Sequence, residues 1–291
     1  MKRKNWMPLL LILLSLAVFV GYRQYDAWKT DDRAPEISIN DTQLLQISVQ
    51  SPKTELLQGV KAQDRRDGDV SGKLVVERIQ LLNRDGLMEV GYAVADGSGN
   101  VAKAVRKVQY TDYESPKFSL ERPLIYEEHE TIDIMSAVLA NDVLDGDIQH
   151  RIRATAMSNE SISKPGIHQV HFQVTNTLGD TSEIVIPVEV LETNTYEAEL
   201  TLTDYLIYLP QGSAFQPRAY LSEFTSKGTT TSLANGLPGD FSLEIAGELP
   251  SQTAGVYPVE YRVTYTVRHA TNPDYDQRFT GYSKLIVVVE G

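Results

Sequence analysis

Two short phrases of the sequence each place three aspartates around a glycine. The first runs Asp64-Arg-Arg-Asp67-Gly-Asp69 and the second Asp142-Val-Leu-Asp145-Gly-Asp147. Calcium prefers clustered carboxylate and carbonyl oxygens, so both triplets are candidate calcium sites. Asp-Gly-Asp is also a good turn, in which the aspartates accept hydrogen bonds from nearby backbone amides. Neither phrase has the bidentate glutamate of an EF-hand loop. The calcium and the turn interpretations therefore both stay open, and no other cofactor is expected.

Several kinds of chemistry are excluded by what the sequence lacks. The chain has no cysteine, which rules out disulfides, thiol catalysis and cysteine-ligated zinc or iron–sulfur centres. No nucleophile elbow, phosphate-binding loop or dinucleotide fingerprint occurs. The formal net charge of -12 disfavours a nucleic-acid partner, which would need a basic patch. We therefore expect a protein that is not an enzyme and does not bind nucleic acid.

A repeated strand pattern organises the chain from residue 34 onward. Three segments begin with a glycine and continue with valine, an aromatic residue and valine at every second position. They are Gly86 to Val94, Gly166 to Val174 and Gly255 to Val263. Such alternation buries one face of a β-strand and leaves the other in solvent. Return strands are predicted at 101–110, 183–191 and 282–289.

The repeats divide the chain into an N-terminal segment and three domains. A length of 291 residues leaves room for two or three domains. Many short strands, with turn signals about every ten residues, are typical of tandem β-sandwiches. The predicted boundaries are 1–33, 34–112, 113–192 and 193–291. The third domain has diverged, with an insertion at 226–236 and a long loop at 268–277.

The motifs of the first two domains resemble those of a known family. The phrases Ala-Pro-Glu-Ile, Ala-x-Asp-x-x-Asp-Gly-Asp-Val and Gly-x-x-x-Val-x-Tyr-x-Val-x-Asp-x-x-Gly-Asn begin at residues 34, 62 and 86. They resemble the bacterial immunoglobulin-like repeats of insecticidal crystal proteins and of Gram-positive cell-surface proteins. The resemblance implies immunoglobulin-like sandwiches that serve as spacers or adhesive modules, and it carries no catalytic residues. It is clear over the first two domains and partial over the third.

The N-terminus predicts a single membrane anchor. Residues 5–22 carry no charge and would span about 27 Å as a helix, close to the thickness of a bilayer core. Tryptophans bracket this segment, as expected at the headgroup level. The anchor residues that we single out are Trp6, Leu9, Leu13, Phe19 and Trp28. A cleaved signal peptide, with small residues at Ser15 and Ala17, is the alternative. Basic residues 2–4 and the acidic remainder of the chain place the N-terminus in the cytoplasm and the C-terminal domains outside the cell.

The predicted function is that of an anchored, non-catalytic stalk and binding module of a bacterial cell surface. Loops on a rigid scaffold carry recognition, so the divergent third domain is the expected binding part. Its candidate residues are Arg268, Asp274 and Tyr275 in the long loop. The partner would be a protein or a glycan of the cell envelope. A structural spacer or assembly subunit of an envelope complex is the alternative, and an envelope hydrolase is a third, disfavoured class.

Overall fold

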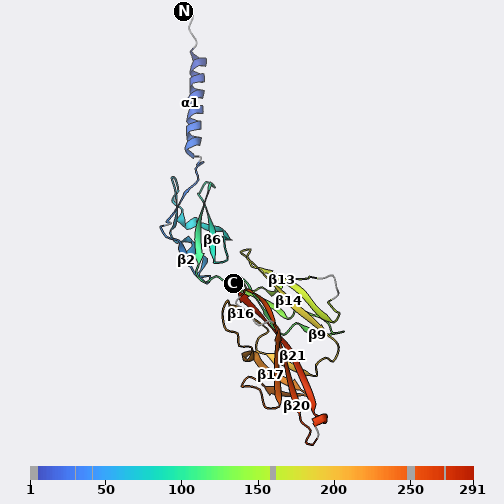
Figure 1. Cartoon of the computed structure of the whole chain (residues 1–291). Helices are drawn as coiled ribbons and strands as arrows, with labels where there is room; N and C mark the ends of the chain where they lie inside the picture. Colours follow the sequence, from blue (N-terminus) through green and yellow to red (C-terminus); the bar gives the residue numbers. More distant parts are fainter. Residues whose placement is uncertain (1–5, 30, 41, 158–161, 248–252, 272) are drawn as a thin grey trace, which may run out of the picture. The chain divides into compact units, whose positions relative to one another are not determined.

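The computed structural model describes residues 6–29, 31–40, 42–157, 162–247, 253–271 and 273–291 and gives no side-chain placement for 26–29 and 273. Two compact units make up the chain, Met1–Tyr113 and Glu114–Gly291 (Figure 1). We call the strands β1–β7 the first domain, β8–β14 the second domain and β15–β21 the third domain. The first unit holds the first domain and a helix, and the second unit holds the other two domains.

The helix α1, Met7–Lys29, opens the chain. Its segment Met7–Tyr25 has a mean hydropathy of 1.7, and none of it is buried by the rest of the protein. Among the described residues this is one helix with the length and apolarity to cross a membrane. The other helical segments in the described part are 3-10 turns of three to five residues.

The first domain pairs a sheet of three strands with a sheet of four. The strand orders are β1-β3-β4 and β2-β7-β6-β5. The bounds are β1 Glu36–Ile39, β2 Leu45–Ile47, β3 Val60–Asp64, β4 Gly68–Asp69, β5 Val75–Leu81, β6 Leu87–Ala95 and β7 Val101–Tyr110. The 3-10 turns are η1 Lys53–Leu57 and η2 Ser71–Lys73. As the period-two pattern predicts, Val90, Tyr92 and Val94 of β6 are all buried in the core.

The second domain repeats this arrangement strand for strand. Its orders are β11-β10-β8 and β12-β13-β14-β9. The bounds are β8 Lys117–Leu120, β9 Ile125–Glu127, β10 Val138–Asp142, β11 Gly146–Asp147, η3 Gln149–Arg151, β12 Arg153–Ala156, β13 Gly166–Thr175 and β14 Thr181–Leu191. Each domain pairs its short second strand parallel to its last strand, β2 with β7 and β9 with β14. The predicted tandem β-sandwiches behind one N-terminal apolar helix are thereby confirmed.

The third domain differs because its seven strands all belong to one hydrogen-bonded sheet. The order is β18-β17-β15-β21-β20-β19, and β16 also pairs with β21. The bounds are β15 Ala198–Leu202, β16 Leu206–Pro210, η4 Pro217–Tyr220, β17 Leu221–Ser226, β18 Thr229–Ser232, β19 Phe241–Gly247, β20 Gly255–Val267, η5 Pro273–Tyr275 and β21 Gln277–Glu290. The sheet covers a core that includes Phe224, Tyr261 and Leu285.

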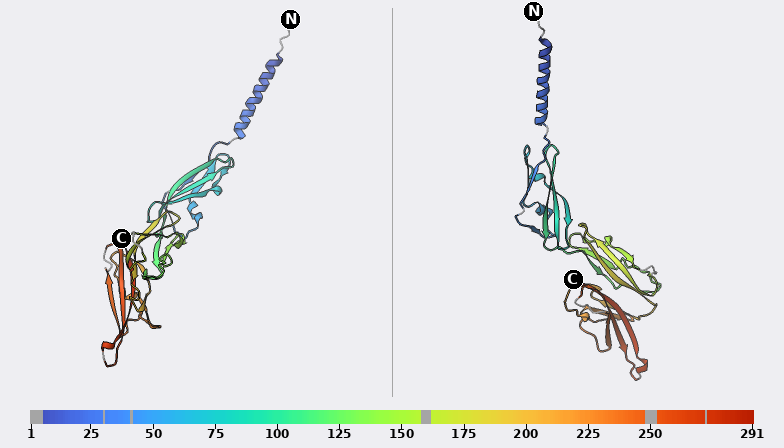
Figure 2. Two further views of the ribbon diagram at one scale, coloured as in Figure 1. Left: turned by 90° about the vertical axis from the view of Figure 1, so that its right-hand side faces the viewer. Right: turned by 45° about the horizontal axis from the view of Figure 1, so that its top comes forward.

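The predicted insertion at 226–236 and the described part of the predicted loop at 268–277 both contain regular elements. The insertion at 226–236 contains β18, which pairs with β17 across a turn at Lys227 and Gly228. Both turn residues have positive φ, 48° and 76°, as a two-residue hairpin of the favoured twist requires. The long loop, with η5, joins β20 to β21 at the end of the third domain opposite the C-terminus (Figure 2).

Candidate functional site

The first aspartate of each acidic phrase orders its own loop. Asp64 Oδ1 accepts the backbone N–H groups of Arg66 and Asp67 at 2.7 and 2.8 Å. In the second domain Asp142 Oδ1 accepts the corresponding two N–H groups, of Leu144 and Asp145, both at 2.9 Å. These are the local side-chain to backbone bonds of the turn interpretation. The turn is therefore present in both repeats.

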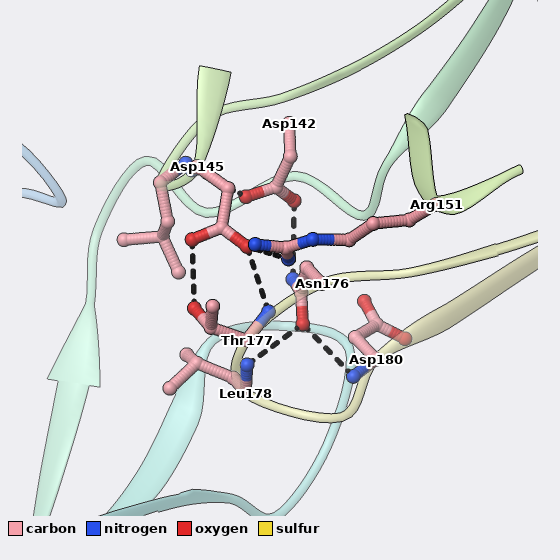
Figure 3. Close-up of polar contacts among 8 residues, drawn as sticks. Asp142, Asp145, Arg151, Asn176, Thr177, Leu178 and Asp180 are labelled. Atoms are coloured by element: carbon pink, nitrogen blue, oxygen red, sulfur yellow. Dashed lines mark hydrogen bonds and ion pairs between the residues drawn. The ribbon is translucent and has the colours of Figure 1, made fainter. Parts of the chain in front are cut away.

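The second aspartate of each phrase reaches across to the hairpin turn between the two long strands. Asp67 accepts the backbone N–H of Gly97 in the turn between β6 and β7. Asp145 accepts both the N–H and the hydroxyl of Thr177 at 2.7 Å and forms an ion pair of 2.5 Å with Arg151 (Figure 3). This aspartate therefore fastens the loop to the hairpin at one end of the sandwich.

The third aspartate begins the 3-10 turn that follows. Asp69 accepts the backbone N–H of Ser71, and Asp147 accepts that of Gln149, both at 2.9 Å. The three aspartates of each predicted triplet thus make separate hydrogen bonds, each to a different part of the chain. The calcium prediction for the two triplets stays a prediction.

The structure brings a different set of carboxylates together in the first domain. Asp31, Asp64 and Asp96 each offer an oxygen, and these oxygens lie within 4.8 Å of one another. In the second domain Asn176 stands where the first has Asp96, and its amide donates to Asp142 at 3.0 Å (Figure 3). In the second domain a neutral amide therefore lies beside one buried carboxylate, whereas in the first domain two buried carboxylates lie side by side. Such an oxygen set suits a hard cation such as calcium.

The local hydrogen bonds keep both buried carboxylates of the first domain ionised. The backbone amides of Asp67 and Arg66 lower the pKa of Asp64, against the opposing effects of burial and of the nearby Asp96 charge. Burial raises the pKa of Asp96, but hydrogen bonds from Asn100 and Ser98 outweigh it and lower the pKa overall. Two neighbouring negative charges at neutral pH repel each other, and a bound cation would relieve that repulsion.

Calcium is expected to stabilise the first domain more than the second. At a calcium concentration of about 100 times the dissociation constant, the gain in unfolding free energy would be about 2.7 kcal/mol. The Asp96→Asn variant copies Asn176 and should abolish this gain. Calorimetry with millimolar calcium and then with a chelator measures the effect. An unchanged melting temperature would mean that the loops are turns alone.

Acid is expected to loosen the second domain through Asp145. Burial raises the pKa of Asp145, yet Thr177 and Arg151 outweigh it and hold the pKa below its ordinary value. The carboxylate therefore contributes stability above its unfolded pKa of about 4, and the contribution is lost as the pH falls through the folded value. Asp145→Asn should cost about 1 to 3 kcal/mol at pH 7 and flatten the stability profile below about pH 4. Urea unfolding at several pH values checks this, with the exposed Asp147→Asn as the control.

Two members of the oxygen set in the first domain were not singled out by sequence reasoning. Asp96 begins the turn Asp96-Gly-Ser-Gly-Asn, which aligns with Asn176-Thr-Leu-Gly-Asp of the second domain, and this alignment is a signal in the sequence. Asp31 precedes the repeats in the linker, and no pattern marks it. Its backbone carbonyl accepts the side-chain amide of Asn100 at 2.9 Å, which ties the linker to the hairpin turn.

The predicted binding residues Arg268, Asp274 and Tyr275 all lie exposed at the tip of the third domain. The side chain of Tyr275 is among the most exposed large apolar groups, at 68%. Its ring lies 5.5 Å from that of His269, whose backbone N–H donates to Asp276. Exposure makes these residues accessible to a partner, and binding at this tip stays a prediction.

The predicted anchor residues that the structure describes point outward around α1. Trp6 precedes the helix, and Leu9, Leu13 and Phe19 are 57 to 59% exposed. Trp28 lies within the helix, but its side chain is outside the described residues. One exposed N-terminal apolar helix is consistent with both a signal anchor and a signal peptide.

No family model matches the chain. The sequence is similar to that of the pesticidal crystal protein Cry22Aa of Bacillus thuringiensis, with 24% identity over 253 residues. The match covers 84% of this chain but only 32% of the relative, so the chain spans about a third of that protein's length.

Comparison with solved structures finds multidomain proteins at low overall similarity. The M60 catalytic domain of Clostridium perfringens ZmpB with its CBM51 domains is 12% identical. That match covers 90% of this chain and 43% of the ZmpB chain, with a TM-score of 0.24. The protocadherin GammaB4 extracellular domain is 11% identical, with coverage of 89% and 50% and a TM-score of 0.20. Mouse cadherin-23 EC22-24 is 9% identical, with coverage of 89% and 99% and a TM-score of 0.21. The sequence match makes the chain a distant homologue of a crystal protein, and its own strands form tandem β-sandwiches behind an apolar helix.

Proposed function

We propose that the chain is a membrane-anchored, non-catalytic protein of a bacterial cell surface, in which immunoglobulin-like domains present the tip of the third domain to a partner. The observation that carries this proposal is the joint between the second and third domains. A module that presents a binding surface must hold that surface in a fixed position. The contacts across this joint join the two domains into one body.

Apolar side chains of the third domain complete the core of the second. Leu206 of β16 and Ile286 of β21 are 7 and 2% exposed and belong to the same buried cluster as Phe118 and Phe172. The hydroxyl of Tyr208 accepts the backbone N–H of Phe118 at 2.9 Å. Contacts of this kind resist bending because separating the domains would expose apolar surface to water.

Polar contacts fix the same joint. Lys284, only 5% exposed at its side chain, lies 2.5 Å from the Glu189 carboxylate of the second domain. The hydroxyl of Tyr282 donates to that carboxylate at 2.8 Å. Burial, and then the Glu189 charge, raise the pKa of Tyr282 and keep it a hydrogen-bond donor. A directional network adds a defined orientation to the apolar contact.

The anchor and the charge distribution support the placement. Basic residues at positions 2–4 precede the apolar helix, and the chain as a whole is acidic, with a formal net charge of -12. This arrangement favours a cytoplasmic N-terminus and domains outside the cell. The resemblance of the repeats to spacer and adhesive modules supports the non-catalytic role.

Crosslinking on intact cells, followed by mass spectrometry, tests the proposal. The variant Arg268→Ser/Tyr275→Ser removes two of the three predicted contact residues and leaves the joint intact. Leu82→Ser, an exposed apolar residue of the first domain, is the matched control. We expect one neighbour to be lost with the tip variant and kept with the control. The same neighbours with both variants would favour the alternative, a spacer or assembly subunit of an envelope complex.

A further inference from the structure

An arginine is buried in the core of the first domain. Arg106, in the middle of β7, is 6% exposed and lies opposite Val90 of β6. Its Nε donates to the hydroxyl of Tyr92 at 2.7 Å, and its guanidinium lies over the Tyr92 ring. Its two terminal nitrogens donate to the backbone carbonyls of Gln58 and Leu56 at 2.7 and 2.5 Å.

The fold does not require a cation at this position, because the other two domains have none there. The equivalent cross-strand pair in the second domain is Val170 with Ile186. In the third domain it is Val259 with Leu285. Ile186 and Leu285 are both fully buried. A buried charge is costly, and here the guanidinium also holds the backbone carbonyls at the end of η1, a turn that has no counterpart between β9 and β10 of the second domain.

The guanidinium borders a cavity of about 600 Å³ at the surface of the first domain. Half of the described lining residues carry amide side chains, and Arg106 is the one charged residue among them. The amide residues are Asn40, Gln43, Gln46 and Gln58. A guanidinium has five N–H donors, and the described contacts use three of them. One N–H on each terminal nitrogen is left for a further hydrogen bond, and a carboxylate is a preferred acceptor for a guanidinium.

The charge of the first domain permits an anionic ligand, in contrast to its neighbour. Residues 34–112 contain ten basic and 11 acidic side chains, so the domain is almost neutral. Residues 113–192 contain five basic and 14 acidic side chains, and their field would repel an anion. The candidate cation set at Asp31, Asp64 and Asp96 is not part of this cavity's lining.

We propose that the first domain binds a small hydroxylated ligand that carries a carboxylate, of the uronic acid class, in this cavity. Arg106 holds the carboxylate, and the amides of Asn40, Gln43 and Gln46 exchange hydrogen bonds with hydroxyl groups. Amides both donate and accept, which suits the hydroxyls of a sugar. The site gives the domain nearest the membrane helix in sequence a binding role separate from that of the tip.

The test is a calorimetric titration of the full-length protein in detergent micelles with glucuronate, glucose and inorganic phosphate. Glucuronate differs from glucose by the carboxylate at one carbon. We expect saturable binding of glucuronate that is at least tenfold tighter than that of glucose. Binding of glucose equal to that of glucuronate would overturn the proposal. Phosphate binding without glucuronate binding would overturn the assignment to a carboxylated sugar, and so would the absence of binding by all three.

Two variants separate binding from folding. Tyr92→Phe/Arg106→Ile copies the Phe172 and Ile186 pair of the second domain and should lose glucuronate binding more than tenfold. Its melting temperature should fall, because the carbonyls of Leu56 and Gln58 lose their donors. Gln43→Ala/Gln46→Ala changes exposed side chains and leaves the Arg106 contacts intact. It should weaken binding severalfold without a change in melting temperature. Undiminished binding in both variants would place the ligand elsewhere.

Discussion

Replacing Glu189 with alanine is expected to lower the free energy of unfolding of the second and third domains by about 1.5 to 3 kcal/mol, the value of a hydrogen bond to a charged group. The carboxylate accepts from both Lys284 and Tyr282, each of which is buried. Its removal leaves an ammonium group inside the joint, where the nearest remaining acid is Glu260 at 3.7 Å. A buried charge that keeps only this longer ion pair is less well compensated, and weakening its pairing costs more than it would for an exposed charge.

Differential scanning calorimetry of the full-length protein in detergent measures this effect. The matched control is Glu183→Ala on the same strand β14, where the carboxylate is 53% exposed and pairs with His171 at 3.4 Å. An exposed pair of this kind contributes about 0 to 1 kcal/mol. The double variant Glu189→Ala/Lys284→Met also removes the buried ammonium group and should recover most of the lost unfolding free energy. Equal effects of Glu189→Ala and Glu183→Ala would mean that the joint does not depend on its ion pair.

The strands of the first two domains could be predicted from the sequence because their signal is local. A glycine turn followed by alternating apolar residues is enough to identify β6 and β13 and the buried face of each. The predicted return strand at 101–110 coincides with β7. The hairpin turns between β6 and β7 and between β13 and β14 need residues that tolerate positive φ. Gly99 and Gly179 meet that need, with φ of 91° and 83°.

The contacts between domains could not be predicted in the same way. Leu206 and Ile286 look like ordinary core residues of their own strands, and nothing in their neighbours in sequence shows that they pack on the second domain. The same limit applies to Asp31, which joins Asp64 and Asp96 only because the linker folds back onto the hairpin turn. Such pairings depend on long-range geometry, which periodicity does not encode.

For the cavity at Arg106, the sequence predicts the burial of the arginine but not the cavity beside it. Parity along β7 places Arg106 on the buried face, opposite Val90, so its burial could have been inferred from the strand pattern. The cavity itself depends on Asn40, on residues 43–46 and on Gly59, whose positive φ of 75° turns the chain close to Asn40. Comparison among the repeats is the signal that sequence analysis can offer here, because Ile186 and Leu285 occupy the equivalent places.

Deleting residues 193–291 is expected to unfold the second domain, not to leave a stable shortened stalk. The deletion removes Leu206 and Ile286 from the core cluster of the second domain, together with the partly buried Tyr208 and Val288 that pack against it. Loss of one large buried apolar side chain costs about 2 to 5 kcal/mol, and a domain has only about 5 to 15 kcal/mol of net stability. The exposed patch should also promote aggregation.

Calorimetry and limited proteolysis of the 1–192 chain check this expectation. The first domain should keep its own transition, because the structure places it in a separate compact unit. The transition of the second domain should move to a much lower temperature or disappear. The full-length variant Leu206→Ala/Ile286→Ala should reproduce part of the loss without removing the third domain. If the second domain of the 1–192 chain melts at its original temperature, the shared core does not support it. The second domain would then be an independent unit, and a partner lost on truncation could be assigned to the third domain directly.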